Sequence, residues 1–245
     1  MNKTGFEYRL KESPRGRNIR LRVTLSRGLE VYVPRGYDTS KLPDLLEKRK
    51  NWITTALERR KAQRKFFEPE PAWCLPHTIS LPAIGIVWHI DLKETHTEHV
   101  ALREISKHRL VAFGNVNNES AGRRALARWL TRQTREHLVP RVRELSLRTG
   151  LKYKRIFVRK QRTRWASCSR RKIISLNSKL LFLRPDLIDY VILHELCHLA
   201  EMNHSKRFWS LLKSHSPNYL RLDSELREMW KVVPRWAYDI PSKRR

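Results

Sequence analysis

The chain has 245 residues, and its 52 lysines and arginines against 24 aspartates and glutamates give a formal net charge of +28. A hydrophobic content of 40% and eight tryptophans are typical of a folded protein and exclude a disordered chain. No apolar run approaches the roughly 18 residues of a membrane span, so a membrane protein is not expected.

Three short strands are predicted at the beginning of the chain. Apolar and charged side chains alternate in residues 7–10, 19–23 and 29–33. Turns are indicated between these runs, at Pro14–Gly16 and at Arg27–Gly28. The pattern predicts a small antiparallel sheet.

A basic helix and a linker come next. The helix is expected to begin at Pro43 and to reach Lys65, with a basic outer face. The segment Phe66–Pro76 contains three prolines and is predicted to be a linker. Two further strands are predicted over residues 78–92 and 100–113.

A long helix and a strand pair follow. From Glu119 to about Arg148 the apolar residues recur at helical spacing, as Leu126, Trp129, Leu130, Leu138, Val142 and Leu145. Residues 156–159 and 172–177 are predicted to be strands on either side of a loop that contains Trp165. Residues 173–180 are predicted either to offer an edge to an extended peptide or to form an ordinary half-buried strand.

Pro185 is expected to start the helix that carries the most informative motif of the chain, His194-Glu-Leu-Cys-His198. On a helix, His194 and His198 lie one turn apart and point the same way, so two imidazoles can share one metal ion. Glu195 sits beside the first histidine and can reach a zinc-bound water as general base. Cys197 is expected to point away and to pack in the core.

His204 is the predicted third metal ligand, six residues after His198. The metzincin pattern has the same spacing but a glycine where this chain has Glu201. The turn is therefore assigned to Asn203, and a second helix is expected to begin at His204. A distal carboxylate such as Glu225 is the alternative ligand. Structural zinc is the rival interpretation, but the motif holds no fourth Cys or His to close the site.

Polar residues around the motif are candidates for supporting roles. Tyr190 and Arg207 are both placed where they could lie near the metal, although a structural role is favoured for each. Glu201 and His215 are candidates to orient the imidazoles. No residue is identified for substrate binding or for stabilising an oxyanion.

Four segments together resemble the YgjP-like metal-dependent hydrolases, relatives of the SprT-like and WLM zinc metallopeptidases. The segments are residues 164–169, 174–177, 189–198 and 202–209, within a close match from Lys152 to Leu212. The resemblance implies a zincin-like fold, zinc on His194, His198 and His204, and a catalytic Glu195. Ala166 departs from the family, which often has glycine there.

The predicted fold is α+β, with a zincin-like catalytic core preceded by a small antiparallel β-sheet subdomain. Three parts are expected. Residues 1–66 form a β-rich subdomain with a basic helix, residues 67–117 form a connecting β-hairpin region, and residues 118–245 form the catalytic domain. Three scattered cysteines without a C-x-x-C pair suit a reducing compartment, and the beginning of the chain lacks an apolar leader, so a cytoplasmic location is expected.

The charge indicates the kind of partner. A surplus of +28 attracts polyanions, so weak nucleic-acid binding is an expected property, and residues 48–65 are the first candidate surface. P-loop and G-x-S-x-G patterns are absent from the sequence, which leaves ATP-driven and serine-hydrolase chemistry without support.

Three functions stay open. The sequence favours a zinc metallopeptidase acting on a peptide through a Glu195-activated, zinc-bound water. The alternatives are a zinc hydrolase that cleaves phosphoanhydrides of nucleotides or other small anionic substrates, and a nucleic-acid-associated SprT-like protease.

Overall fold

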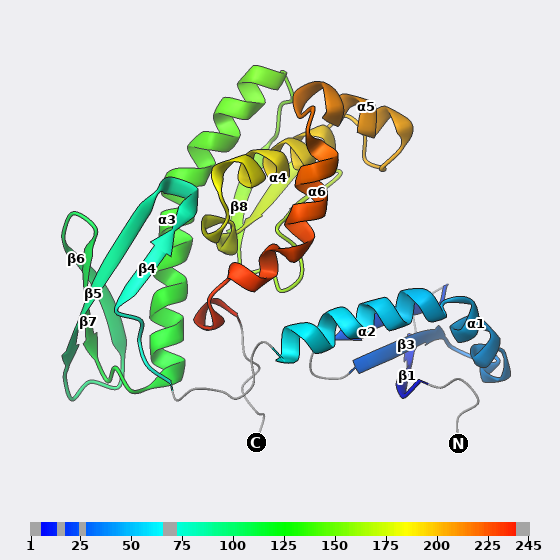
Figure 1. Ribbon diagram of the computed structural model, residues 1–245, viewed down its shortest axis with the longest axis horizontal. Coiled ribbons are helices and arrows are strands. Elements are labelled where there is room, and N and C mark those ends of the chain that lie inside the picture. Colours follow the sequence, from blue (N-terminus) through cyan, green and yellow to red (C-terminus); the bar gives the residue numbers. More distant parts are fainter. Residues whose placement is uncertain (1–5, 14–17, 25–27, 66–72, 239–245) are drawn as a thin grey trace. The chain divides into compact units, whose positions relative to one another are not determined.

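The computed structural model describes residues 6–13, 18–24, 28–65 and 73–238, and it divides into two compact units, residues 1–71 and 72–245 (Figure 1). Helices and strands both contribute to each unit, so the predicted α+β class is confirmed. Among the described residues no helix combines the length and the apolar character needed to cross a membrane.

The first unit contains a three-stranded sheet and two helices. Its elements are β1 (Tyr8–Ser13), β2 (Arg20–Thr24), β3 (Gly28–Pro34), α1 (Leu42–Lys48) and α2 (Lys50–Lys65). The strand order is β1-β3-β2, with β3 parallel to β1 and antiparallel to β2. The predicted antiparallel sheet is therefore wrong for one of the two pairs. Strand β3 lies in the centre of this sheet. Its side chains Leu29, Val31 and Val33 are all buried, whereas the apolar side chains of β2 are only half-buried.

The predicted basic helix is interrupted. Arg49, with φ −107° and ψ 8°, separates α1 from α2. Leu42, Leu46 and Ile53 are buried and pack in one core with the apolar side chains of β3. Lys48 and Lys50 are exposed, as a basic outer face requires. The side chains of residues 58–65, most of the predicted linker and the turns at 14–16 and 27 lie outside the described residues.

The second unit begins with a four-stranded sheet in the order β4-β5-β7-β6. Its strands are β4 (Thr78–Leu81), β5 (Ile86–Glu94), β6 (Val100–Ser106) and β7 (Arg109–Gly114). Each of the two predicted strands is thus divided by a tight turn. Gly85, with φ +65°, lies in the first turn, and His108, with φ +60°, lies in the second.

A long helix, α3 (Glu119–Thr149), connects the two layers of the second unit (Figure 1). It begins at Asn118, whose side chain accepts a hydrogen bond from the amide of Ala121, and it ends at Gly150, with φ +72°. All six residues of the predicted stripe are buried. The β4–β7 sheet packs against its N-terminal half, where Arg128 donates to the carbonyl of Val100.

The second layer of this unit holds a three-stranded sheet and three helices. They are β8 (Arg155–Arg159), β9 (Ala166–Cys168), β10 (Ile173–Asn177), α4 (Pro185–Cys197), α5 (Lys206–His215) and α6 (Tyr219–Glu228). Short 3₁₀ helices in the two units cover residues 39–41, 82–84, 178–182, 229–232 and 235–237.

The strand order in this sheet is β8-β10-β9. Because β10 is paired on both sides, residues 173–180 offer no free edge, and the predicted peptide-binding edge is wrong there. The short strand β9 is an edge of the sheet instead, and it packs against α4. One continuous core joins both layers of residues 72–245. The finer division at residues 67–117 and 118–245 stays a prediction about domains.

Candidate metal centre

The helix α4 is buried on most sides, which sets the environment of the motif. It begins at Pro185, as predicted, with Asp186 in its first turn. Nine of its thirteen residues are buried, and the apolar ones occupy more than a single face. A helix with this pattern belongs to a core rather than to a surface. His194, Glu195 and His198 are therefore polar groups placed in an apolar setting.

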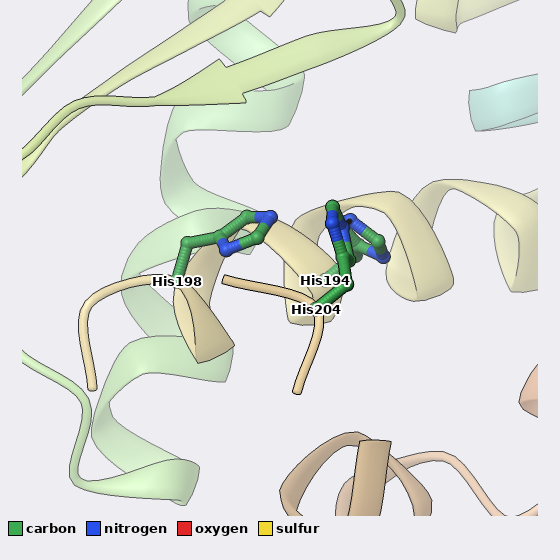
Figure 2. A group of neighbouring side chains, drawn as sticks. All are labelled: His194, His198 and His204. Carbon is green, nitrogen blue, oxygen red and sulfur yellow. Dashed lines mark hydrogen bonds between the residues drawn. The ribbon is translucent and has the colours of Figure 1, made fainter. Parts of the chain in front are cut away.

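The structure brings the three predicted histidines together. His194 and His198 come from the end of α4, and His204 comes from the segment between α4 and α5 (Figure 2). One ligand nitrogen from each histidine lies within 4.8 Å of the other two. The Nε2 atoms of His194 and His204 are 3.0 Å apart.

This spacing fits a shared metal ion. Nitrogen atoms bound to one tetrahedral zinc at about 2.0–2.1 Å lie about 3.3–3.4 Å from each other. The observed 3.0 Å is close to that separation. The three imidazoles could therefore hold a metal ion.

A main-chain carbonyl orients one of the imidazoles. Nδ1 of His198 lies 3.0 Å from the carbonyl oxygen of Glu201. A proton on Nδ1 that is donated to this oxygen leaves Nε2 free as a ligand. Glu201 was predicted to orient an imidazole, and the group that makes the contact is its main-chain carbonyl. His215, the other residue predicted to orient an imidazole, is half-buried at the end of α5, and within the described part of the chain no hydrogen bond or ring contact joins it to the three histidines.

Phe208 forms an apolar floor beneath all three rings. Its ring centroid lies 4.9 Å from that of His194, 4.6 Å from that of His198 and 4.7 Å from that of His204. Phe208 is fully buried. Trp209 stacks on the exposed His204 at 5.5 Å. Neither aromatic residue was among the candidate site residues of the sequence analysis, so their contact with the site was missed.

The chain turns from α4 to α5 without a left-handed residue. Among the described residues other than glycine, only His108 and Lys172 have positive φ, so the role predicted for Asn203 is wrong. The helix ends instead in a tighter, 3₁₀-like turn. In this turn the N–H of Leu199 donates to the carbonyl of Leu196, and the N–H of Ala200 donates to the carbonyl of Cys197. Ser205 caps α5, and His204 precedes that helix rather than starting it.

Burial keeps two of the imidazoles neutral. Burial, the largest cause, and the neighbouring His198 and His204 together lower the pKa of His194 to about 4. Burial also lowers the pKa of His198. Neutral imidazole is the form that binds metal ions, so these two residues need not lose a proton at neutral pH before binding one.

Glu195 is buried beside the edge strand β9. Its carboxylate accepts a hydrogen bond from the main-chain N–H of Cys168. Burial raises the pKa of Glu195 to about 7, while the Cys168 N–H and the positive charge of Arg164 oppose this rise. The sequence motif placed Glu195 beside the histidines, but it did not reveal the contact with β9.

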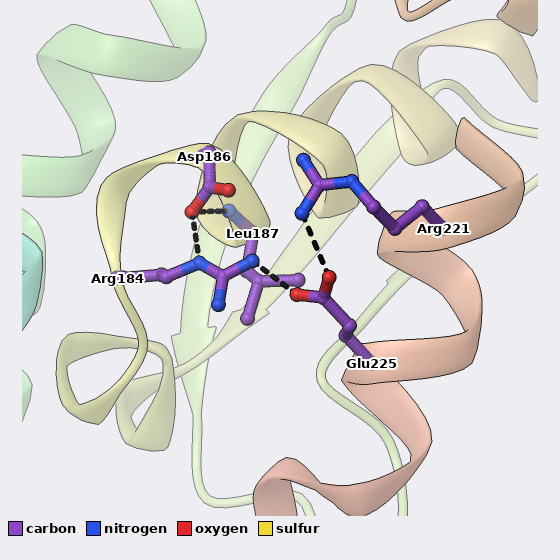
Figure 3. A network of polar contacts seen from close by, with 5 residues as sticks. All are labelled: Arg184, Asp186, Leu187, Arg221 and Glu225. Carbon is purple, nitrogen blue, oxygen red and sulfur yellow. Dashed lines mark hydrogen bonds and ion pairs between the residues drawn. The ribbon is translucent and has the colours of Figure 1, made fainter. Parts of the chain in front are cut away.

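The structure also places the four remaining residues that the sequence singled out. The hydroxyl of Tyr190 donates to Asp223 of α6 at 3.0 Å, so it holds two helices together. Arg207 is exposed on α5. Cys197 is buried in the core, as expected. Glu225, the alternative third ligand, pairs with Arg184 and Arg221 (Figure 3), and this occupies its carboxylate away from the histidines.

Similarity to solved structures is limited to part of the chain. The metallopeptidase zymogen of Pyrococcus abyssi abylysin is 21% identical, with a TM-score of 0.33 over 35% of this chain and 87% of that one. The metallopeptidase zymogen of Methanocaldococcus jannaschii jannalysin is 23% identical, with a TM-score of 0.32 over 35% of this chain and 88% of that one. No curated protein matches the chain at a significant level.

A family model covers far more of the sequence. The model for the YgjP-like metallopeptidase domain matches residues 17–229. This range contains the three histidines, Glu195 and strand β9. The family implies a metal cofactor, and the histidine group provides ligands for one. The chain therefore belongs to the YgjP-like family and carries its metallopeptidase domain.

Proposed function

We propose that this protein is a zinc-dependent metallopeptidase in which His194, His198 and His204 hold the metal and Glu195 is the general base. The observation that carries the proposal is the convergence of three imidazoles, with ligand nitrogens within 4.8 Å of one another, beside a buried carboxylate. Isolated buried carboxylates are costly, so a protein keeps one beside a metal-ligating group chiefly where chemistry needs it.

The donor set favours zinc and an open coordination position. Three imidazoles are a ligand set that catalytic zinc uses, whereas structural zinc normally has a fourth protein ligand. Zinc, when bound, supplies Lewis acidity that makes water acidic near neutral pH and polarises a carbonyl oxygen. Within the described residues, no fourth His, Cys, Asp or Glu joins the group of three.

Glu195 is held where a base must stay fixed. The N–H of Cys168 favours the ionised form of this carboxylate, which is the form that accepts a proton. In the proposed reaction Glu195 accepts the proton of the attacking water and passes it to the leaving nitrogen. Strand β9 runs beside this carboxylate as an edge, and an edge strand can pair with an extended peptide. This arrangement favours a peptide as substrate.

The base is tested with Glu195→Gln on a panel of peptides. Zinc content, measured by elemental analysis, should stay near one per chain while turnover falls about 10²- to 10⁴-fold. Glu201→Gln is the matched control. Because Glu201 contacts His198 through its main-chain carbonyl, this variant should keep the activity of the wild type. Unchanged turnover in Glu195→Gln would exclude the proposed mechanism.

The third ligand is tested separately with His204→Ala. Loss of one of three protein ligands should reduce the zinc content sharply, and His215→Ala should leave it unchanged. Full retention of zinc in His204→Ala removes this residue from the site.

A second candidate function is the hydrolysis of nucleotide phosphoanhydrides. It is favoured by Arg164, whose positive charge acts on Glu195 and could attract an anionic substrate. Nucleoside triphosphates belong in the same substrate panel. Their turnover by the wild type, lost in Glu195→Gln, together with inert peptides, would select this alternative.

A further inference from the structure

The outer strand β8 exposes an aromatic ring between two arginines. Along this strand the exposed positions alternate with half-buried ones, and the exposed side chains are Arg155, Phe157 and Arg159. Phe157 is 40% exposed, so one part of its ring is open to solvent. The guanidinium carbon of Arg159 lies 5.3 Å from the centre of the Phe157 ring.

The charged residues in the sequence around this strand are all positive. Residues 145–185 contain no aspartate or glutamate. Ten lysines and arginines lie between residues 152 and 172, and all ten are exposed. We call these ten residues together with Phe157 the basic edge; the cations are Lys152, Lys154, Arg155, Arg159, Lys160, Arg162, Arg164, Arg170, Arg171 and Lys172.

These cations differ from many others in the same unit. Arg141, Arg184, Arg221 and Arg227 each pair with a carboxylate. Within the described residues, none of the ten cations of the basic edge forms an ion pair with a carboxylate. Unpaired cations at this density raise the local positive potential, which favours a polyanionic partner.

The segments that carry the cations are fixed by the fold. The amide of Lys154 donates to the carbonyl of Lys172, which ties the beginning of β8 to the turn before β10. The buried Asn177 donates to the carbonyls of Gln161 and Arg164, at 2.8 and 2.7 Å. The basic edge is therefore preorganised, and binding would cost less ordering entropy than binding to a free basic tail.

We propose that the basic edge binds single-stranded nucleic acid, with a base stacked on Phe157 and with phosphates on Arg155 and Arg159. These arginines are four residues apart on one strand, which places them about 13 Å from each other with the ring between them. An acidic peptide would use the charges but has no comparable use for the exposed ring. Aromatic rings among basic side chains are typical of sites for unpaired bases. The inference does not depend on the proposed peptidase.

Fluorescence titrations of the full chain with a labelled 12-nucleotide single strand, at several salt concentrations, test the proposal. Phe157→Ala and Phe157→Leu should both weaken binding about 5- to 100-fold with an unchanged salt slope, because a stacked base is lost. Phe157→Leu keeps an apolar side chain on the strand and so controls for folding. Arg155→Gln and Arg159→Gln should each reduce the log–log salt slope by roughly 0.7.

Matched controls come from the other sheet of the same unit. Phe113 is 36% exposed on β7, and Arg103 is exposed on β6. Phe113→Ala and Arg103→Gln should leave binding within about twofold of the wild type. The proposal is overturned by absent binding at low salt, or by equal losses in controls and basic-edge variants. Displacement of the strand by poly-glutamate of equal charge at equal concentration would also overturn it, in favour of an acidic polypeptide.

Discussion

The helices α3 and α4 follow the same arrangement of strands and yet have opposite characters. In each case the third strand of a trio lies between the first two, as β5-β7-β6 before α3 and β8-β10-β9 before α4. The third strand is parallel to the first and antiparallel to the second in both trios. Beside its buried stripe, α3 has a face that is exposed to solvent, whereas α4 is buried on most sides. The shared strand arrangement therefore does not determine the chemical character of the helix that follows it; the sequence of the helix does.

The two helices also treat their buried polar groups differently. On α4, Glu195 and His198 each have a main-chain partner, from Cys168 and Glu201. On α3, the side chain of Gln133 is buried, and its Oε1 accepts no hydrogen bond from the described residues. A hydrogen bond compensates a buried polar group for the water that it loses, whereas an unpaired group leaves this desolvation cost in the folded state. Three variants test this contrast.

The largest effect is expected at the floor of the metal centre. Phe208→Ala removes a fully buried ring that contacts all three imidazoles, and it should destabilise the second unit by about 3–5 kcal/mol. Zinc binding should weaken as well, because the rings lose their common support. Denaturant unfolding followed by tryptophan fluorescence measures the change, since seven of the eight tryptophans belong to residues 72–245.

An exposed leucine of α3 is the control for this variant. Leu147 is 78% exposed, so Leu147→Ala should change the free energy of unfolding by less than about 0.5 kcal/mol. Similar losses in the two variants would contradict the role of Phe208 as a buried support of the metal centre.

A smaller effect of opposite sign is expected on α3. Gln133→Met replaces the unpaired amide by an apolar side chain of similar length, and it should stabilise the second unit by up to about 1 kcal/mol. Asn177→Leu is the comparison, because that buried amide uses both its nitrogen and its oxygen in hydrogen bonds. It should destabilise by about 2–3 kcal/mol. Equal destabilisation by the two variants would show that Gln133 is also fully paired.

The smallest effect is expected at the beginning of α4. A hydrogen bond from Arg184 holds the pKa of Asp186 below its ordinary value, so the ionised carboxylate stabilises the folded state. Asp186→Asn should cost less than about 1 kcal/mol at pH 7, because the pair is exposed to solvent.

The pH dependence of this variant follows from the sign of the shift. The contribution of Asp186 is present above the unfolded-state pKa of about 3.9 and is lost as the pH falls through the lower folded-state value. The denaturation curves of wild type and Asp186→Asn should therefore differ most at pH 7 and approach each other as the pH falls below about 3.9. Glu136→Gln, which removes an exposed carboxylate on α3, is the control variant for the loss of one negative charge.

Much of the fold was predictable where one local signal sufficed. The periodic apolar stripe located α3, and Pro185 located the beginning of α4. The three histidines were grouped correctly because helical spacing fixes two of them and a short connection brings the third. Strand order was not predictable, because alternating side chains indicate which face is buried and not which strand lies in the centre.

The missed parts of the site depend on contacts between distant segments. Strand β9 has three residues, too few for a periodic pattern. Its N–H reaches Glu195 only after β10 and α4 have packed. The contact of Phe208 with all three imidazoles likewise depends on how α5 folds back on α4, which no spacing in the sequence specifies.

The contacts between α4 and α6 tie the metal centre to a segment that supplies none of its ligands. Tyr190 binds Asp223, and Arg184 binds Glu225 (Figure 3), so the beginning and the middle of α4 are held by α6. If these helices open together, their amide protons should exchange with solvent at a common free energy of opening. During synthesis, a chain that has not yet been extended beyond α5 would then lack Asp223 and Glu225, the partners of α4. The metal centre would be assembled late, after residues 219–228 have docked.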